Sequence, residues 1–274
     1  MSHTVSYVPP KTVRAFMLDN SRRRVIRGPV GSGKTVGCGP IEIMRRAAMQ
    51  APDQTGIRRT RWAVVRNTAR QLVDTTIKTW LDWIPAGQAG TYRIVDKTFV
   101  VHYNDIHAEV MFRALDDAAD KRNLLSLELT GAFLNEAREV DREIVELMDT
   151  RIGRYPKMDN GGPTWFGMWG DTNPPNEGEY WYYILENLNP DKYTPDNSWK
   201  VFVQPSALSP EAENIDHLPP GYYEKAMENK SEEFINVYFR NQYGRSREGK
   251  PVHPLFKRER NVPRHPLVAN THCV

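Results

Sequence analysis

The residues with the clearest chemical use lie between positions 28 and 35, where the chain reads Gly-Pro-Val-Gly-Ser-Gly-Lys-Thr. This order matches the pattern G-x-x-x-x-G-K-T, in which the glycines leave backbone N–H groups free to converge on a polyphosphate. Lys34 has the reach and the charge to bind the terminal phosphates, and the Thr35 hydroxyl can ligate Mg²⁺. We therefore predict a nucleotide-binding loop for ATP and Mg²⁺ made by Gly28, Pro29, Val30, Gly31, Ser32, Gly33, Lys34 and Thr35.

Hydrolysis also needs a carboxylate that polarises the attacking water, and this group usually follows a second apolar strand. Residues 127–137 read Leu-Glu-Leu-Thr-Gly-Ala-Phe-Leu-Asn-Glu-Ala, which makes Glu136 the candidate catalytic base. Asn135 stands where an aspartate would support the metal. Its amide oxygen can order a metal-bound water but brings no charge. The alternative, that Glu136 is a solvated acid at the start of a polar helix, stays open.

Apolar patterns on either side of these motifs indicate the elements that position them. Short blocks of β-branched and aromatic residues predict strands, and apolar residues at helical spacing predict helices between them. The predicted strands are 24–27, 61–66, 98–103, 108–115, 124–134, 164–170 and 200–203, and the predicted helices are 34–49, 68–83, 177–187, 219–229 and 231–243. This alternation favours an α/β fold with a mostly parallel sheet that helices cover on both faces.

The helix after the nucleotide-binding loop contains an internal conflict. Gly37, Gly39 and Pro40 fall inside it, and proline in a helix interior costs about 3 kcal/mol because it lacks an N–H and clashes with the preceding turn. We expect a kink or a short first helical segment at this point.

Length and composition exclude several other classes of protein. The chain has 274 residues, a formal net charge of +3 and two cysteines, Cys38 and Cys273, too few for a disulfide scaffold or a zinc site. It contains neither an apolar run long enough for a membrane helix nor a secretory leader pattern. Positive charge is local: residues 245–264 hold seven Lys or Arg against two acids, and Arg58, Arg59 and Arg61 form a second cluster. Either is a candidate DNA contact, or simply a linker and a solvated loop.

Taken together, the motifs resemble the N-terminal ATPase domain of the large terminase subunit, the DNA-packaging motor of tailed double-stranded-DNA bacteriophages. The resemblance is carried by residues 28–35, 61–68, 72, 75–80, 133–137, 151–156, 170–175 and 180–181. It implies a RecA-like P-loop NTPase of the ASCE type with a small lid or linker region. Residues 1–244, with an N-terminal extension over 1–20, would be the ATPase domain. Residues 245–274 would be a basic linker toward a nuclease domain, whose activity we expect to be absent from this chain.

The same resemblance implies further residues and partners. An arginine would complete the site, with Arg122 favoured over Arg113, Arg151 and Arg154, and Thr172 with Asn173 would couple hydrolysis to movement. Double-stranded DNA, the capsid portal protein and the small terminase subunit would be the partners. The chain would be a monomer in isolation and a pentameric ring on the portal, in the host cytoplasm and without a membrane.

Two other functions stay open on the sequence alone. One is a different P-loop ATPase, such as a helicase. The other is an assembly module that binds nucleotide without turnover, which Asn135 suggests because it brings no charge to the metal.

Overall fold

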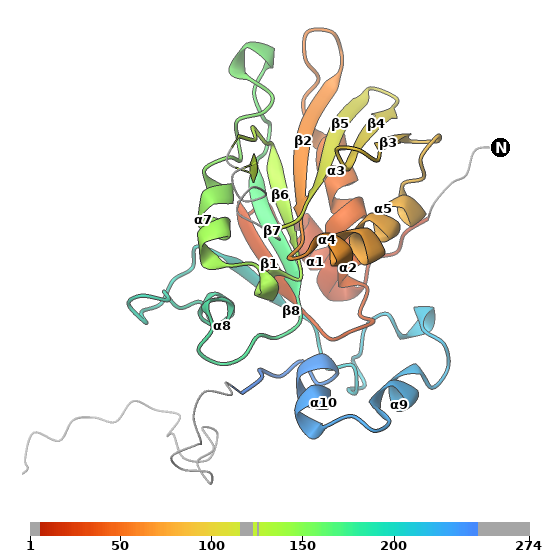
Figure 1. Ribbon diagram of the computed structural model, residues 1–274, viewed down its shortest axis with the longest axis vertical. Coiled ribbons are helices and arrows are strands. Elements are labelled where there is room, and N and C mark those ends of the chain that lie inside the picture. The colour runs from red at the N-terminus through yellow and green to blue at the C-terminus, as the bar shows by residue number, and fades with distance from the viewer. Residues whose placement is uncertain (1–5, 116–122, 125, 246–274) are drawn as a thin grey trace, which may run out of the picture. The chain divides into compact units, whose positions relative to one another are not determined.

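The computed structural model describes residues 6–115, 123–124 and 126–245. Its strands are β1 (Arg23–Arg27), β2 (Arg58–Val65), β3 (Gly90–Arg93), β4 (Thr98–Tyr103), β5 (Ile106–Arg113), β6 (Gly131–Asn135), β7 (Gly167–Thr172) and β8 (Lys200–Val203). Within the described ranges they form one sheet in the order β3-β4-β5-β2-β6-β7-β1-β8 (Figure 1). Pairing is parallel from β5 to β8, while β3 and β4 add an antiparallel edge. The predicted mostly parallel sheet is confirmed.

Helices surround this sheet. The α-helices are α1 (Lys11–Leu18), α2 (Lys34–Val36), α3 (Glu42–Met49), α4 (Ala69–Gln71), α5 (Lys78–Trp83), α7 (Arg142–Asp149), α8 (Tyr180–Leu185), α9 (Tyr222–Met227) and α10 (Glu232–Tyr238). Short π-helical segments span Gly37–Ile41 and Leu72–Ile77, and 3₁₀ turns span Ala137–Glu139, Met158–Asn160 and Ile215–His217. No helix in these ranges combines the length and apolar character needed to cross a bilayer.

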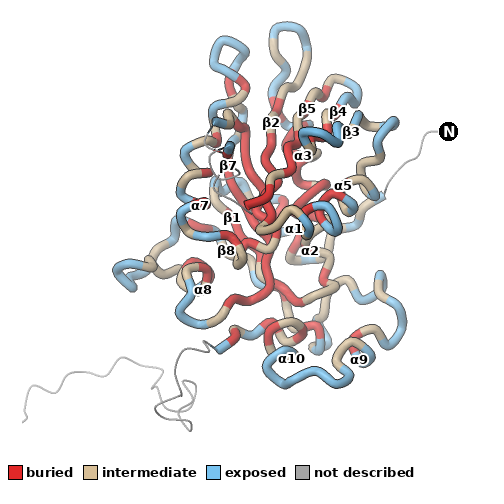
Figure 2. Tube along the Cα trace, viewed as in Figure 1, coloured by how far each residue is buried: buried red, intermediate tan, exposed pale blue. Residues whose placement is uncertain are grey.

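Side chains along the central strands point alternately to the two faces of the sheet, so the core is divided into two layers. On β2, Trp62 and Val64 pack with α3 and α5, whereas Ala63 and Val65 pack with α7 and α8 on the opposite face. Successive strand residues point to opposite faces, so an apolar run is buried on both sides. Figure 1 shows the two helical layers, and Figure 2 shows the central strands buried along most of their length.

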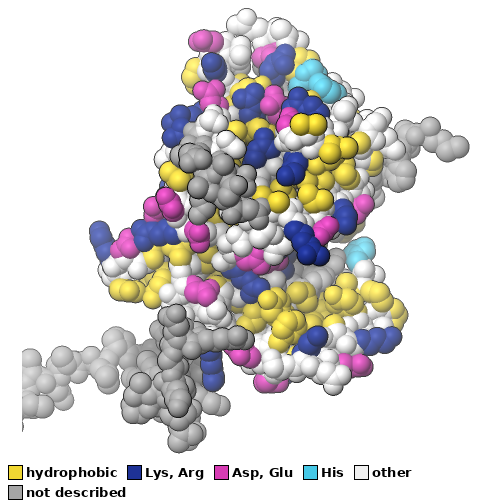
Figure 3. All heavy atoms as spheres, in the orientation of Figure 1, with side chains coloured by type: hydrophobic (Ala, Val, Ile, Leu, Met, Phe, Trp, Pro, Cys, Tyr) yellow, Lys and Arg dark blue, Asp and Glu magenta, His cyan; other side chains and the backbone are white. Residues whose placement is uncertain are grey.

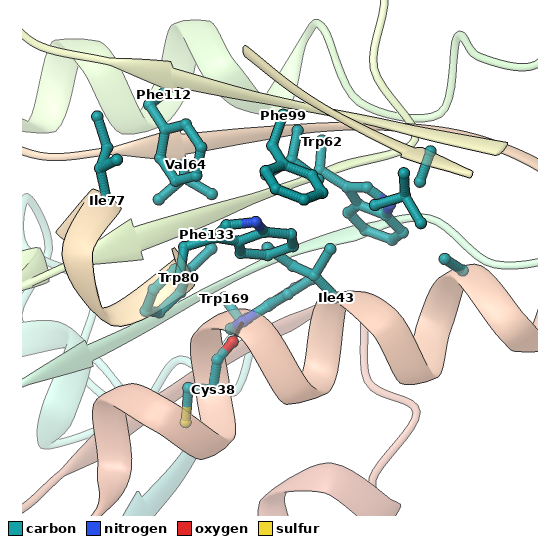
Figure 4. Close-up of a cluster of buried hydrophobic side chains, with 14 of the residues drawn as sticks. Cys38, Ile43, Trp62, Val64, Ile77, Trp80, Phe99, Phe112, Phe133 and Trp169 are labelled. Atoms are coloured by element: carbon teal, nitrogen blue, oxygen red, sulfur yellow. Dashed lines mark hydrogen bonds between the residues drawn. The ribbon is translucent and has the colours of Figure 1, made fainter. Parts of the chain in front are cut away.

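The first layer is rich in aromatic rings. Trp169 on β7 lies against Trp62 and Phe133, with ring centroids 5.5 and 6.3 Å apart (Figure 4). Its indole Nε1 also donates a 2.6 Å hydrogen bond to the carbonyl of Cys38, in the π-helical segment after α2. This bond gives a partner to a carbonyl in the distorted turn and fastens that turn to the sheet.

Several predicted boundaries need correction. The helix predicted over 34–49 is broken as expected, because α2 ends at Val36 and the π-helical segment containing Pro40 precedes α3. The strand predicted over 124–134 is shorter and shifted, since β6 begins at Gly131. The edge strand β3 and the helix α7 were not among the predicted elements. The strands predicted over 98–103 and 108–115 are present as β4 and β5, which pair antiparallel around Asn104.

The chain divides into two units, Met1–Gly244 and Arg245–Val274, and of the second unit the structure describes Arg245 alone. The predicted basic stretch therefore lies almost entirely outside the described residues. The other basic cluster lies at the amino end of β2, where every guanidinium has an acidic partner: Arg58 with Asp105, Arg59 with Asp53 and Arg61 with Glu109. That end of the sheet is opposite the nucleotide-binding loop.

A buried ion-pair cluster ties the strand before the loop to the helix after it. Glu42 on α3 accepts hydrogen bonds from Arg24 on β1 (2.9 Å) and from Arg46 (2.8 Å), and the side chains of Glu42 and Arg24 are fully buried. Arg24 also donates to the carbonyls of Phe16 and Asp19, which holds the end of α1. The cluster thus fixes both ends of the loop relative to one another.

We predict that Glu42→Gln lowers the free energy of unfolding by about 3–5 kcal/mol, because it leaves the buried guanidinium of Arg24 without a counter-charge. Urea denaturation measures this loss. Glu146→Gln is the matched control, since Glu146 forms an exposed pair with Arg142 on α7 and its loss costs little. Equal effects of the two substitutions would contradict the structural role of the cluster.

Candidate nucleotide-hydrolysis site

The predicted nucleotide-binding loop leaves β1 at the carboxyl end of the sheet and enters α2. Gly31 and Gly33 have φ angles of 72° and 77°, a left-handed conformation that residues with a Cβ adopt at a cost. Among the described residues, the backbone N–H groups of Gly31, Ser32 and Gly33 donate no hydrogen bond. Successive free amides at a helix start form a concave anion site, so the loop has the donors that a polyphosphate requires.

The carbonyl groups of the loop from Gly28 to Ser32 all have side-chain partners. Asn173 donates to Gly28 O (2.8 Å), Tyr223 to Val30 O (3.0 Å), Asn214 to Gly31 O (2.7 Å) and Gln204 to Ser32 O (3.0 Å). The remaining carbonyl, of Pro29, accepts from the loop's own Ser32 hydroxyl and Lys34 ammonium. Because the carbonyls are held in this way, the amides are left to face a ligand.

Lys34 is buried, with its Nζ 2.9 Å from Pro29 O. Burial lowers the pKa of its ammonium, and the nearby carboxylates of Glu136 and Asp171 partly offset this shift. A buried cation that bonds only a carbonyl gains a stronger partner when an anion enters the loop. Lys34 therefore fits the phosphate-binding role that the sequence predicts.

Glu136 lies beyond the end of β6, at the same edge of the sheet as the loop. Its backbone has φ 53° and ψ 59°, a conformation that is rare for a residue with a side chain and is concentrated at functional sites. Burial raises the pKa of the Glu136 carboxyl, Lys34 lowers it, Asp171 raises it, and Arg66 and Arg138 lower it. The predicted base is thus a half-buried acid beside the loop lysine.

Asn135 and Asp171 are register partners on β6 and β7. Asn135 Nδ2 donates to Asp171 Oδ1 (3.0 Å), and Asn135 Oδ1 accepts from the Thr76 hydroxyl (2.7 Å). Asp171 Oδ2 in turn accepts from the Thr35 hydroxyl of the loop at 2.5 Å. Asp171 is a site residue to which the sequence analysis gave no role, although it belongs to the 170–175 motif.

The predicted coupling residues Thr172 and Asn173 bridge the loop and Glu136. Thr172 O accepts from Gly28 N at 3.1 Å, Asn173 Nδ2 donates to Gly28 O, and Asn173 N lies 3.5 Å from Glu136 Oε2. Two arginines that the sequence analysis did not select also reach this edge. Arg66 donates to Asn135 O, and Arg138 donates to Pro174 O and to the hydroxyl of Tyr238.

Of the four predicted arginine candidates, the three that the structure describes do not gather at the site. Arg122 lies outside the described residues. Arg151 and Arg154 contact Leu129, at the amino end of the sheet and away from the loop. Arg113 ends β5, which is four strands from β1 and thus on the order of 19 Å away across the sheet. None of these three arginines therefore lies beside the loop of its own chain.

The donor set fits a magnesium nucleotide. Within the described ranges, His, Cys, Asp and Glu form no group of three or more that could hold a metal by themselves. Magnesium is commonly held by one or two protein oxygens together with substrate phosphates and water. The Thr35 hydroxyl beside the Asp171 carboxylate matches that requirement.

The strand that ends in the nucleotide-binding loop is separated from the strand of Glu136 by a single strand, β7. With this order the sheet and its helices form an α/β fold of the RecA-like P-loop type. No protein-family model matches the chain, and neither does any curated protein.

Solved structures of large terminases are similar to this chain. One is the large terminase from a thermophilic bacteriophage, with TM-score 0.64, 12% identity and coverage of 87% of this chain and 54% of that chain. Another is the large-terminase ATPase domain of Thermus phage P74-26 (TM-score 0.55, 14% identity, 86% and 94% covered). A third is the HK97 bacteriophage large terminase (TM-score 0.54, 10% identity, 84% and 48% covered).

Other structures of the first of these terminases contain ADP or ATP-γ-S. The chain spans about half the length of the first and third structures and nearly all of the isolated ATPase domain. At these identities the likeness establishes the fold.

We predict that Glu136→Gln raises the Tm of the protein at neutral pH. The folded-state pKa of this acid lies above its ordinary value of 4.5, so its ionisation costs native-state stability that builds up as the pH rises above 4.5 and is complete above the folded pKa. The gain should shrink as the pH falls through that pKa and vanish below 4.5. Thermal unfolding of both proteins between pH 4 and 8 tests this, and a gain independent of pH would contradict it.

Proposed function

We propose that this chain is the ATP-hydrolysing motor domain of a viral DNA-packaging terminase large subunit, which drives double-stranded DNA into a procapsid. The observation that carries the proposal is the meeting of free loop amides, buried Lys34 and half-buried Glu136 at one sheet edge. The fold that brings them together is similar to that of the P74-26 terminase ATPase domain, and the match covers 94% of that domain.

Each residue has a physical role in this proposal. The amides of Gly31, Ser32 and Gly33 bind the phosphate oxygens, and Lys34 leaves Pro29 O to pair with them. Thr35 contributes the metal-ligating hydroxyl. The contact with the metal through water that the sequence predicts for Asn135 would use its amide oxygen, which already accepts a hydrogen bond from Thr76. Magnesium, when bound with the nucleotide, neutralises charge that develops on the phosphates. Glu136 accepts a hydrogen bond from the attacking water and orients it toward the terminal phosphate.

An arginine from a neighbouring subunit would complete the site. Such a group stabilises charge in the transition state and contributes about 10³–10⁵ in rate. Arg122, favoured from the sequence, and Arg113, Arg151 and Arg154 remain the candidates in a ring of subunits. Arg66 and Arg138 already contribute positive charge near Glu136 from the same chain.

Thr172 and Asn173 are proposed to couple the nucleotide state to movement, because they contact both the loop and Glu136. The lobe containing α9 and α10 lies at this end of the sheet, and hydrophobic side chains gather over it (Figures 1 and 3). Tyr238 of α10 accepts from Val30 N through its carbonyl and from Arg138 through its hydroxyl. A conformational change of the loop would thus be transmitted directly to the lobe through these hydrogen bonds.

The proposed assembly is a pentameric ring of this chain in the host cytoplasm. Its proposed partners are double-stranded DNA, the portal protein and the small terminase subunit. Residues 1–244 are the proposed ATPase domain, and the basic stretch from 245 is a proposed linker or DNA contact. Contacts with DNA phosphates would weaken steeply as salt rises.

A nucleotide-binding assembly module without turnover is the second candidate. The observation in its favour is Asn135, which brings no charge to a position usually held by an aspartate. A helicase-like ATPase remains a third alternative on the same fold, and strand-separation assays distinguish it from a packaging motor.

We predict that Glu136→Gln lowers kcat for ATP hydrolysis by about 10²–10⁴-fold while ADP still binds, because the amide cannot accept the proton or orient water as the carboxylate does. Phosphate release, measured with and without DNA and over a range of protein concentration, tests this. Glu143→Gln on the exposed face of α7 is the control and should match the wild type.

The dependence of the hydrolysis rate on protein concentration tests whether a neighbouring subunit supplies an arginine. A rate per chain that rises with concentration supports the ring. Background rates for the wild type at every concentration, with ADP bound normally, would overturn the motor proposal and favour the module without turnover.

A further inference from the structure

The carboxylate that contacts the loop threonine comes from β7 and not from the strand of Glu136. Asp171 is fully buried, and its two oxygens accept from three donors: the Thr35 hydroxyl, the Asn135 amide and the Glu136 backbone N–H. It therefore links the loop, the polar end of β6 and the catalytic-base candidate in one hydrogen-bonded group.

The orientation of the Asn135 amide follows from its neighbours. An ionised carboxylate only accepts hydrogen bonds, so the NH₂ group of Asn135 must face Asp171. Its oxygen then faces Thr76, from which it accepts at 2.7 Å. Asn135 thus uses its NH₂ group to hold Asp171, and its oxygen is already paired on the side away from Asp171.

We propose that Asp171 supplies the carboxylate of the divalent-cation site, with Asn135 as the amide that holds it, so that the charge expected on β6 stands on β7. This rests on the proposed function in one respect, that Thr35 ligates a cation bound with the nucleotide. Asp171 is a positioning residue, because it acts on the cation through Thr35 and through water.

Asp171 positions the Thr35 hydroxyl so that its oxygen faces the cation. A hydroxyl has one hydrogen and two lone pairs, and here the hydrogen is directed at Asp171 Oδ2. The lone pairs of Thr35 Oγ1 are consequently left for a cation in the loop. The negative charge of Asp171 also increases the electron density on that oxygen, as acceptors behind metal ligands commonly do.

Sheet order makes the relocation possible. β7 pairs directly with β1, whereas β6 lies one strand further from the loop. The register places Asp171 opposite Ile26, two residues before the loop begins at Gly28. A short side chain at position 171 therefore reaches Thr35, and its neighbour Asn135 lies about 4.8 Å further across the sheet.

The test compares ADP affinity in Mg²⁺ with ADP affinity in EDTA, measured by calorimetry, so that the readout is binding and not turnover. Asp171→Asn keeps one oxygen for Asn135 and Glu136 but turns an NH₂ group toward Thr35, which reverses the hydroxyl. We expect the gain in ADP affinity from Mg²⁺ to fall about 10–100-fold. ADP affinity in EDTA should stay within about twofold.

Two further variants sharpen the result. Thr35→Val removes the hydroxyl through which Asp171 acts, so the losses of Asp171→Asn and Thr35→Val should not add in the double variant. The exchange Asn135→Asp with Asp171→Asn returns the charge to β6 and keeps one carboxylate in the pair. We expect this exchange to recover most of the Mg²⁺ gain, and it serves as the decisive variant if Asp171→Asn alone does not fold.

A purely structural role for Asp171 predicts different results. Asp171→Asn would then weaken ADP binding equally in Mg²⁺ and in EDTA, or would leave the Mg²⁺ gain unchanged. Either of these results would overturn the proposal. It would also be overturned if the losses of Asp171→Asn and Thr35→Val were additive, or if the exchange variant folded but lacked the Mg²⁺ gain. Failure of the wild type to bind ADP both in Mg²⁺ and in EDTA would instead contradict the proposed function.

Discussion

The site depends on the hydrogen bonds that hold the carbonyls of the phosphate loop. Every carbonyl from Gly28 to Ser32 has a side-chain donor, and four of the donors come from outside the loop. A peptide group that turns its carbonyl outward turns the next amide inward, so these bonds prepare the anion site before a ligand arrives. Preorganisation of this kind spares the cost of ordering donors when the ligand binds.

The same bonds connect the loop to distant parts of the fold. Asn173 follows β7 and Gln204 follows β8, whereas Asn214 precedes α9 and Tyr223 is part of it. Loop geometry is therefore set jointly by the sheet and by the lobe of α9 and α10. Behind the loop, the buried cluster of Arg24 and Glu42 fixes the spacing between β1 and α3. A nucleotide that rearranges the loop must work against both sets of contacts, which provides a physical route from binding to movement.

Local chemistry explains which features the sequence predicts. The loop is predictable because its glycines and its lysine lie within eight residues, and the break at Pro40 follows from a missing N–H. Glu136 could be placed because it closes an apolar strand. The side chains that bond the loop carbonyls could not be predicted. Gln204, Asn214 and Tyr223 are 172, 183 and 193 residues away in sequence from the carbonyls to which they donate. Asp171 was visible in its motif, but its contact with Thr35 depends on a strand order that the sequence does not display.

A structure of the protein with Mg²⁺ and a non-hydrolysable ATP analogue tests the central claim most directly. The account predicts that the terminal phosphates contact the amides of Gly31, Ser32 and Gly33, and that Lys34 Nζ leaves Pro29 O for a phosphate oxygen. It also predicts Glu136 facing a water in line with the last phosphate. A nucleotide bound away from the loop, or a Lys34 that still bonds Pro29 O beside bound phosphates, would contradict the account.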